Sequence, residues 1–351
     1  MTIPRKSTFG AGVLAAVALA LACSERPDPV APEFSTGSPA THATSFSGRA
    51  TVVQATLLNL TPVVLVDAGP LPPEGGAAEA SLLKASVPGL LTAEVLHATT
   101  VAQGNASKSE ASVAELALTV GGNTISAGFL EARATAMCTD GGPTASGSSD
   151  IATLFVNGQA ITISGEPNQT VPLPGGRLII NEQTSARPGD ITVNALHVIV
   201  NGVADVVISS AHADIKCQAG PPPPGCSGGD FVTGGGWITG TPFGAKANFG
   251  VAGGTKQGAF WGHLTYIDHG SGGPHVKGTG VTAYSVVSAT TRHIEGTAEI
   301  NGQGGFAYKV DVTDNGEPGR NDVFAVSLSN GYRASGNLGG GNIQLHAPAC
   351  Q

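Results

Sequence analysis

Near its middle the chain reads Cys217-Gln218-Ala219-Gly220-Pro221-Pro222-Pro223-Pro224-Gly225-Cys226. Each proline fixes its own φ angle and lacks an amide donor, so four in a row cannot join a helix or a sheet ladder. Such a run forms a stiff, extended spacer. We therefore expect a linker at residues 218–225, between a domain that closes at Cys217 and another that opens at Cys226. A length of 351 residues is enough for two domains with a core each.

The composition favours strands over helices. Charged residues make up 12% of the chain, glycine occurs 51 times, and Val, Thr, Ile, Ser and Gly dominate the patterned stretches. The formal net charge is −8 and basic residues do not cluster, which argues against a nucleic-acid partner.

The N-terminus has the pattern of an export signal. Arg5 and Lys6 precede a short apolar run, residues 11–22, that ends in Ala20-Leu21-Ala22-Cys23. This ending resembles a bacterial lipobox, although Ala20 stands where Leu is usual. We expect a lipoprotein signal peptide at residues 1–22 and lipidation of Cys23, which leaves four of the five cysteines to pair. An ordinary signal peptide cut nearby is the alternative.

A proline-containing segment of small polar residues follows, and we interpret residues 23–45 as a disordered tether. The predicted product is a lipoprotein of the cell envelope, held in the outer membrane or at the cell surface through its N-terminal lipid.

The first domain, residues 46–217, consists of about ten alternating segments of strand length or somewhat more, separated by turn residues. Asn157-Gly158, between two apolar stretches, is the strongest hairpin signal. Residues 77–86 are compatible with one short helix. The second domain, residues 226–351, opens with Gly234-Gly235-Gly236-Trp237 and closes on a glycine-rich strand. We predict an all-β fold: two antiparallel sandwich or barrel domains in tandem.

The first domain resembles the choice-of-anchor-P family of bacterial surface proteins. The resemblance lies in Asn157-Gly158-Gln159, Pro172-Leu173-Pro174-Gly175, Asn181-Glu182-Gln183, and residues 192–197 and 204–217. The second domain resembles the C-terminal domain that commonly follows choice-of-anchor-P domains. This likeness lies in residues 231–238, Gly262-His263-Leu264, Asp268-His269-Gly270 and residues 314–320. The resemblance implies export and anchoring, and it implies no catalytic residues.

Four cysteines remain for disulfides, which exported proteins form readily. Cys138 and Cys217 each end a strand pattern, and Cys226 and Cys350 stand at the two ends of the second domain. We predict the pairs Cys138–Cys217 and Cys226–Cys350. Free thiols at Cys138 and Cys217, or a Cys217–Cys226 ring across the prolines, are the alternatives.

The acidic turn at residues 311–322 is the best chemical candidate. Calcium needs several oxygen ligands from one flexible loop, and the carboxylates of Asp311, Asp314, Glu317 and Asp322 are the candidate ligands. We favour a long hairpin turn without calcium. The glycines at 234–236 lack the spacing of a nucleotide-binding loop and predict close packing under Trp237. His263, His269, His275, His293 and His346 lack zinc spacings, so structural or surface roles are the default.

The sequence therefore predicts a non-catalytic, membrane-anchored surface or envelope protein with a structural or adhesive role and no cofactor. One alternative is a carbohydrate-binding or glycan-active β-sandwich, in which Trp237, Trp261 and Tyr266 could stack on sugars. The other is a calcium-stabilised adhesin. A surface glycan or another protein is the expected ligand.

Overall fold

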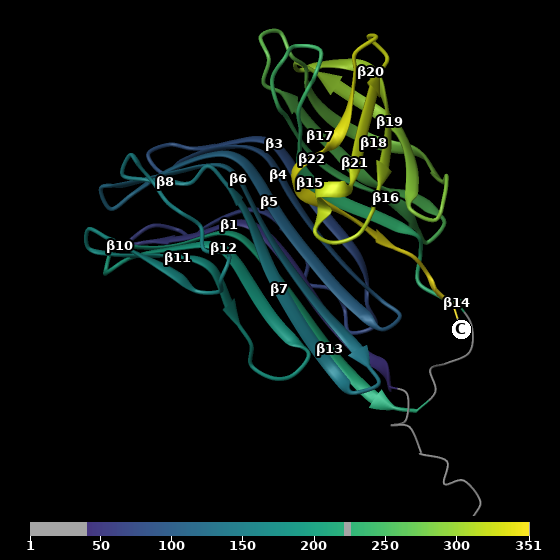
Figure 1. The fold of residues 1–351 in the computed structure, drawn as a ribbon, viewed down its shortest axis with the longest axis horizontal. Helices are drawn as coiled ribbons and strands as arrows, with labels where there is room; N and C mark the ends of the chain where they lie inside the picture. The colour runs from purple at the N-terminus through teal and green to yellow at the C-terminus, as the bar shows by residue number, and fades with distance from the viewer. Residues whose placement is uncertain (1–40, 221–225, 351) are drawn as a thin grey trace, which may run out of the picture. The chain divides into compact units, whose positions relative to one another are not determined.

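A computed structural model describes residues 41–220 and 226–350 of the chain. Cys23 and the prolines at 221–224 lie outside these ranges. The fold is all-β, as predicted, with a sandwich of two sheets followed by a closed barrel (Figure 1). Within the described residues, the one helical element is a short 3-10 turn, η1 (Gly319–Asn321).

The sandwich domain, residues 41–219, places two antiparallel sheets face to face. The first has the strand order β10-β11-β12-β13-β1-β2. The second has the order β3-β4-β5-β6-β8-β9, with β7 paired to β6. The bounds of the first sheet are β1 (Thr41–Leu57), β2 (Val63–Ala68), β10 (Gln169–Leu173), β11 (Gly176–Thr184), β12 (Asp190–Val200) and β13 (Ala204–Ala219). Those of the second are β3 (Gly76–Val87), β4 (Leu91–Gln103), β5 (Ala106–Val120), β6 (Asn123–Thr139), β7 (Gly142–Ala152), β8 (Phe155–Val156) and β9 (Gln159–Ala160).

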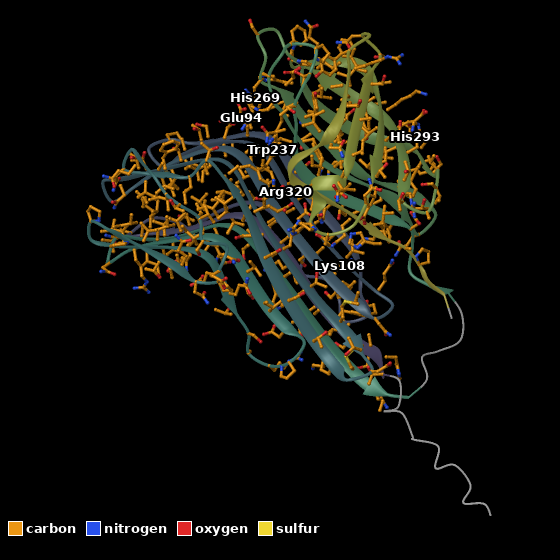
Figure 2. All side chains as sticks on the ribbon, in the orientation of Figure 1. Glu94, Lys108, Trp237, His269, His293 and Arg320 are labelled. Carbon is orange, nitrogen blue, oxygen red and sulfur yellow. A yellow bond between two sulfur atoms is a disulfide. The ribbon has the colours of Figure 1, made fainter. Side chains whose placement is uncertain are left out.

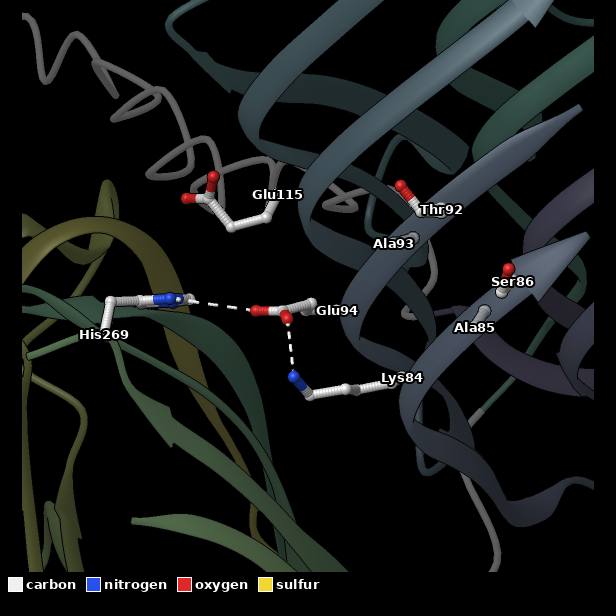
Figure 3. A pocket seen from close by; sticks show the side chains of 8 residues that line it. All are labelled: Lys84, Ala85, Ser86, Thr92, Ala93, Glu94, Glu115 and His269. Carbon is white, nitrogen blue, oxygen red and sulfur yellow. Dashed lines mark ion pairs between the residues drawn. The ribbon is translucent and has the colours of Figure 1, made fainter. Parts of the chain in front are cut away.

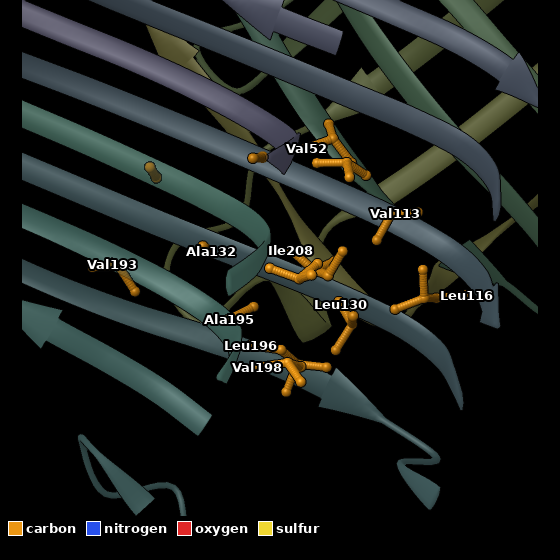
Figure 4. Close-up of a cluster of buried hydrophobic side chains, with 14 of the residues drawn as sticks. Val52, Val113, Leu116, Leu130, Ala132, Val193, Ala195, Leu196, Val198 and Ile208 are labelled. Carbon is orange, nitrogen blue, oxygen red and sulfur yellow. The ribbon is translucent and has the colours of Figure 1, made fainter. Parts of the chain in front are cut away.

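Alternating apolar residues of the two sheets fill the space between them. Figure 4 shows this core, where Val193 and Leu196 of one sheet lie among Val113 and Leu130 of the other. Each is buried, and alternate residues turn inward along most of each strand, as the sequence pattern predicts, although β12 breaks the alternation at Ala195 and Leu196, which are both buried. The opposite face of the sheet that contains β3 to β6 is thereby left free to meet another partner.

Two local predictions in this domain have opposite outcomes. The Asn157-Gly158 hairpin is confirmed, because both residues have positive φ, 50° and 78°, between β8 and β9. The helix at residues 77–86 is wrong, since these residues lie in β3 and pair with β4. Its alanines favour a helix in isolation, but the ladder to β4 overrides such a weak local preference.

The barrel domain, residues 226–350, is an up-and-down barrel in which β22 closes onto β15. Its strands are β15 (Phe231–Ile238), β16 (Ala247–Lys256), β17 (Ala259–Asp268), β18 (His275–Val286), β19 (Thr291–Ile300), β20 (Gln303–Thr313), β21 (Val323–Leu328) and β22 (Arg333–His346). Large side chains occupy its interior: the rings of Phe249 and Phe324 stack 3.9 Å apart beside Tyr266 and Tyr308. The barrel interior is therefore a packed core.

The domain boundaries differ slightly from the predicted ones. β1 begins at Thr41, inside the segment interpreted as a tether, and β13 continues to Ala219, beyond Cys217. Thr41 and Ala219 are paired in register, so the sheet extends further at this end than alternation alone indicates. A separate two-residue ladder joins β14 (Cys226–Ser227) to β23 (Ala349–Cys350).

Candidate functional site at the seam between sandwich and barrel

The sandwich and the barrel belong to one compact unit, and strands β3 to β7 meet strands β15 to β18 and β22 along a seam. Apolar contacts occur in two places along it. Trp237, which Figure 2 labels, packs on Phe129, with ring centroids 5.1 Å apart. Trp261 packs on Phe231, which joins Ala77 of the sandwich in a second cluster. Both tryptophans of the chain thus lie at the seam.

Glycines allow the two backbones to approach closely. A Cβ at Gly235 would lie 2.3 Å from Ser112 Oγ, and one at Gly250 would lie 2.7 Å from His97 Cβ. The prediction of close packing at 234–236 is therefore confirmed at Gly235, but its partner is the sandwich. The glycines beneath Trp237 are instead Gly339 and Gly340, where an added Cβ would collide with the indole.

Polar side chains form a row across the seam-facing sheet. The strand registers place His97 opposite Ser112, Ser112 opposite Glu131, and Glu131 opposite Asp150. His97 Nδ1 lies 2.8 Å from Nε2 of His263 on the barrel, and His263 Nδ1 in turn contacts Glu79. His97 thus binds the barrel at one end of the row, and Asp150 at the other end accepts a hydrogen bond from Gly341 N of β22 at 2.9 Å.

Glu110 and Glu131 are deeply buried in the seam, with 3% and 0% of the residue exposed. Burial raises the pKa of Glu110 to about 8, against the opposing effect of the Arg133 guanidinium. Burial likewise raises the pKa of Glu131 well above its usual value, again opposed by Arg133. Burial and the neighbouring His263 lower the pKa of His97, so this imidazole is neutral.

Two neighbouring β-bulges give the seam a second feature. In β4, Ala93 and Leu96 point into the sandwich core, while Glu94 and Val95 between them both leave it. In β5, Ala114 and Glu115 similarly stand side by side between core positions. Val95 and Glu115 have positive φ angles of 45° and 46°, which are strained for residues with a side chain. The bulges bring Glu94 and Glu115 to the same side of the sheet.

These two carboxylates line a groove with a volume of about 570 Å³ (Figure 3). Lys84 Nζ lies 2.8 Å from Glu94 Oε1, and His269 Nδ1 of the barrel lies 3.7 Å from Glu94 Oε2. Glu115 pairs with Lys246, also of the barrel, at 2.6 Å. The remaining lining residues are Ala85, Ser86, Thr92 and Ala93. The groove thus offers charges of both signs on a floor of small residues, which suits a polar ligand.

Acidic side chains of the turn at residues 311–322 accept hydrogen bonds from backbone amides of β22. Asp314 Oδ2 accepts a hydrogen bond from Leu345 N at 2.9 Å, and Asp322 Oδ2 accepts one from Ile343 N at 2.8 Å. Asp150 of the sandwich accepts one from Gly341 N at 2.9 Å. These amides belong to the part of β22 that extends beyond its ladder with β21, so carboxylates replace the missing strand. The three acids therefore satisfy a sheet edge.

The other candidate calcium ligands are engaged elsewhere. Asp311 Oδ1 lies 2.7 Å from His293 Nδ1 on the neighbouring strand, and Glu317 accepts from Asn342 Nδ2 at 2.9 Å. Burial raises the pKa of Asp322 to about 6, although two backbone amides oppose the shift. In the part of the chain that the structure describes, no three His, Cys, Asp or Glu side chains are grouped to hold a metal ion. The preference for a turn without calcium stays a prediction, and calcium binding stays its alternative.

The predicted cysteine sites lie partly within and partly outside the described residues. Cys138 and Cys217 form a disulfide, as predicted, so Cys217 is not available to Cys226. The backbones of Cys226 and Cys350 lie opposite each other in register, while their pairing stays a prediction. The lipidation site Cys23 lies outside the described residues. Between residues 41–220 and 226–350, no helix is long and apolar enough to cross a membrane.

The five histidines singled out from the sequence have separate places. His263 belongs to the seam and His269 to the groove, whereas His293 lies on the outside of the barrel with Asp311 and Glu295. His346 is buried and contacts Thr233 Oγ1 at 2.9 Å, and His275 is half-buried.

The sequence analysis did not single out the glutamates of the seam. Glu79 is one of them, and four others show the same pattern. Glu94, Glu110, Glu115 and Glu131 interrupt otherwise apolar or small-residue strands, which was the available signal. Strand alternation places them on a face, but it does not show that a second domain covers that face.

Comparisons with known proteins add little to this picture. No protein-family model matches the chain, and no curated protein matches it. Among solved structures, a protein described as a putative AttH from Nitrosomonas europaea aligns at 8% sequence identity, over 87% of this chain and 93% of that one. Its TM-score is 0.19, so the likeness carries no argument.

Proposed function

We propose that this protein is a non-catalytic, lipid-anchored module of the bacterial cell envelope, related to the choice-of-anchor-P proteins, with an adhesive or structural role. The Cys138–Cys217 disulfide supports export, because such bonds persist in oxidising compartments. The export signal and the lipobox-like residues before Cys23 supply the route and the anchor.

The groove is the proposed ligand site, and the paired bulges are the observation that carries this proposal. Bulges bend strands and re-aim side chains beside functional sites. Here two of them turn Glu94 and Glu115 toward one groove at the junction of two domains, which is a common place for ligand sites. A surface glycan or the polar surface of another envelope protein suits its carboxylates and amines.

A glycan would be held by hydrogen bonds and charge rather than by the rings named from the sequence. Trp237 and Trp261 pack in the seam, and Tyr266 is fully buried in the barrel. None of the three lines the groove.

The anchoring part of the proposal is tested by replacing Cys23 with Ala and fractionating the cells. A lipidated cysteine holds the parent in the membrane fraction, so we expect the variant to move to the soluble or secreted fraction. If the displaced protein still contains the disulfide, detected as a change of electrophoretic mobility on reduction, then it was still exported. If the variant remains with membranes as the parent does, the lipoprotein proposal is wrong.

The groove is tested by co-sedimentation of the purified protein, without its first 23 residues, with isolated cell walls. We expect the double variant Glu94→Gln, Glu115→Gln to bind at least tenfold more weakly, because both ion pairs and the acceptors they orient are lost. Glu166→Gln, at an exposed loop position, is the matched control and should bind like the parent. Equal sedimentation of the parent and the double variant would contradict a role for the groove.

A further inference from the structure

The carboxyl groups of Glu110 and Glu131 are buried in the seam, and among the described residues no donor makes a hydrogen bond of good geometry to them. All four of their carboxylate oxygens are buried without a partner, and so is Ser112 Oγ between them. The register pairs Glu110 with Arg133 and Ser112 with Glu131, which makes the two glutamates diagonal neighbours on one face of the sheet. Long side chains at diagonal positions reach each other. Two ionised carboxylates so placed would repel each other in a site without water-facing surface.

The groups around this pair supply too little positive charge. Arg133, on β6, lies 3.3 Å from Glu131 Oε2, but it also lies 3.7 Å from Glu317 Oε2 of the barrel. From β7, Asp150 faces Glu131. From β4, His97 approaches Glu110 Oε1 at 3.7 Å and is neutral.

On β5 itself, burial lowers the pKa of Lys108, and the charges of Glu317 and Asp314 of the barrel oppose this shift. Three of the carboxylates in this group, those of Glu110, Glu131 and Glu317, therefore share Arg133. Gly235 presses against Ser112 from the barrel side, so close packing leaves a proton as the counter-charge that fits.

We propose that Glu110 and Glu131 share a proton, which Glu131 donates to Glu110, and that this proton clasps the barrel onto the sandwich. The bond is an O–H···O⁻ hydrogen bond, which is short and strong when it is buried. Loss of the proton leaves two repelling carboxylates at the centre of the seam. The seam then loosens at alkaline pH while each domain keeps its own core.

The sign of the pH dependence follows from the direction of the shifts. In the closed seam burial raises the pKa values of both glutamates, so above their usual value of 4.5 the closed pair keeps a proton that the open pair has lost. Closure is therefore favoured at low pH and weakens as pH rises toward 8. His97 and His346, whose pKa values burial lowers, act in the opposite direction, but only below their usual value of 6.5. Between pH 6.5 and pH 8, the pH dependence of closure therefore reports the glutamate pair and not these two histidines.

The test uses the two seam tryptophans as reporters on the parent protein without its first 23 residues. Seam opening exposes Trp237 and Trp261 and shifts their fluorescence emission to longer wavelength. A titration with moderate urea concentrations, repeated at each pH, then gives the equilibrium constant between the closed and the open seam. We expect this constant to fall about tenfold per pH unit between 6.5 and 8. Glu131→Gln, whose amide donates to Glu110 without titrating, should flatten the profile. Glu110→Gln provides a second test, and Glu166→Gln should behave like the parent.

Hydrogen exchange separates seam opening from unfolding. We expect β12, in the sheet turned away from the barrel, to stay protected at pH 8.5 while the emission shifts. The proposal is overturned if the closing constant of the parent does not change with pH, or if both Gln variants show the same pH dependence as the parent. It is also overturned if β12 loses its protection at the pH at which the emission shifts. It is also overturned if 1 mM calcium restores closure at pH 8.5, because a cation would then occupy the place of the proton.

Discussion

Replacing Arg133 with Met is expected to lower the free energy of unfolding by about 3–5 kcal/mol, as breaking a buried ion pair does. Arg133 is mostly buried, with 16% of its side chain exposed, between Glu131 of its own strand and Glu317 of the barrel. Without the guanidinium, the carboxylates of Glu110 and Glu131 lose the positive charge that opposes the rise in their pKa values. Urea denaturation at pH 7, followed by circular dichroism, measures the loss.

Arg333→Met is the matched control, because Arg333 is exposed on the barrel and its loss should change stability by less than about 0.5 kcal/mol. The double variant Arg133→Met, Glu110→Gln removes the carboxylate that is left without a counter-charge and should recover part of the loss. If Arg133→Met is as stable as the parent, or if Glu110→Gln does not improve it, the seam does not depend on this charge balance.

Removing the disulfide between Cys138 and Cys217 is expected to cost about 4–5 kcal/mol in the chain-entropy account, for a sequence separation of 79 residues. The bond connects β6 of one sheet to β13 of the other, so the cost comes from the greater freedom of the unfolded chain. Denaturation of Cys138→Ser, Cys217→Ser beside the oxidised parent measures it. Reduction of the parent, which would also open a Cys226–Cys350 bond, should cost at least as much, and a smaller effect from both would contradict this expectation.

The same preparation tests the second predicted bond. Opposite residues of an antiparallel pair have Cα atoms about 4.5–5.5 Å apart, within the range that a disulfide spans. Because Cys226 and Cys350 are opposite in β14 and β23, non-reduced peptide mapping should recover a Cys226–Cys350 peptide. Two free thiols at these positions would show that the ends of the barrel domain are held by the backbone ladder alone.

The fold was largely predictable because strand alternation and turn chemistry are local signals. Asn157-Gly158 makes the predicted hairpin, and the described residues on both sides of the proline run form the predicted all-β domains. Residues 77–86 failed because pairing with β4, a partner outside the segment, decided their conformation. The predicted closing glycine-rich strand is part of β22, in which Gly339 and Gly340 lie beneath Trp237.

The candidate site was predictable only in its parts. Glu94 and Glu115 meet because bulges in two neighbouring strands fall at the same level, and a register shift has no signature in a single sequence. Glu110 and Glu131 are buried because a second domain covers their face, which depends on glycines more than a hundred residues away. The acids of residues 311–322 attracted a calcium hypothesis because their role as acceptors for β22 depends on where its ladder with β21 stops.

The long ladder between β1 and β13 also has a mechanical consequence. It extends from Thr41 opposite Ala219 to Leu57 opposite Ala204, and β1 lies inside its sheet with β2 on its other side. A pull on the chain at Thr41, resisted by a ligand held at the groove, would load β1 along its own axis. Hydrogen bonds loaded in this way share the tension, whereas bonds peeled from one end break in turn. The sandwich would therefore transmit force in shear, with the Cys138–Cys217 bond reinforcing the end of the sheet where the tension enters.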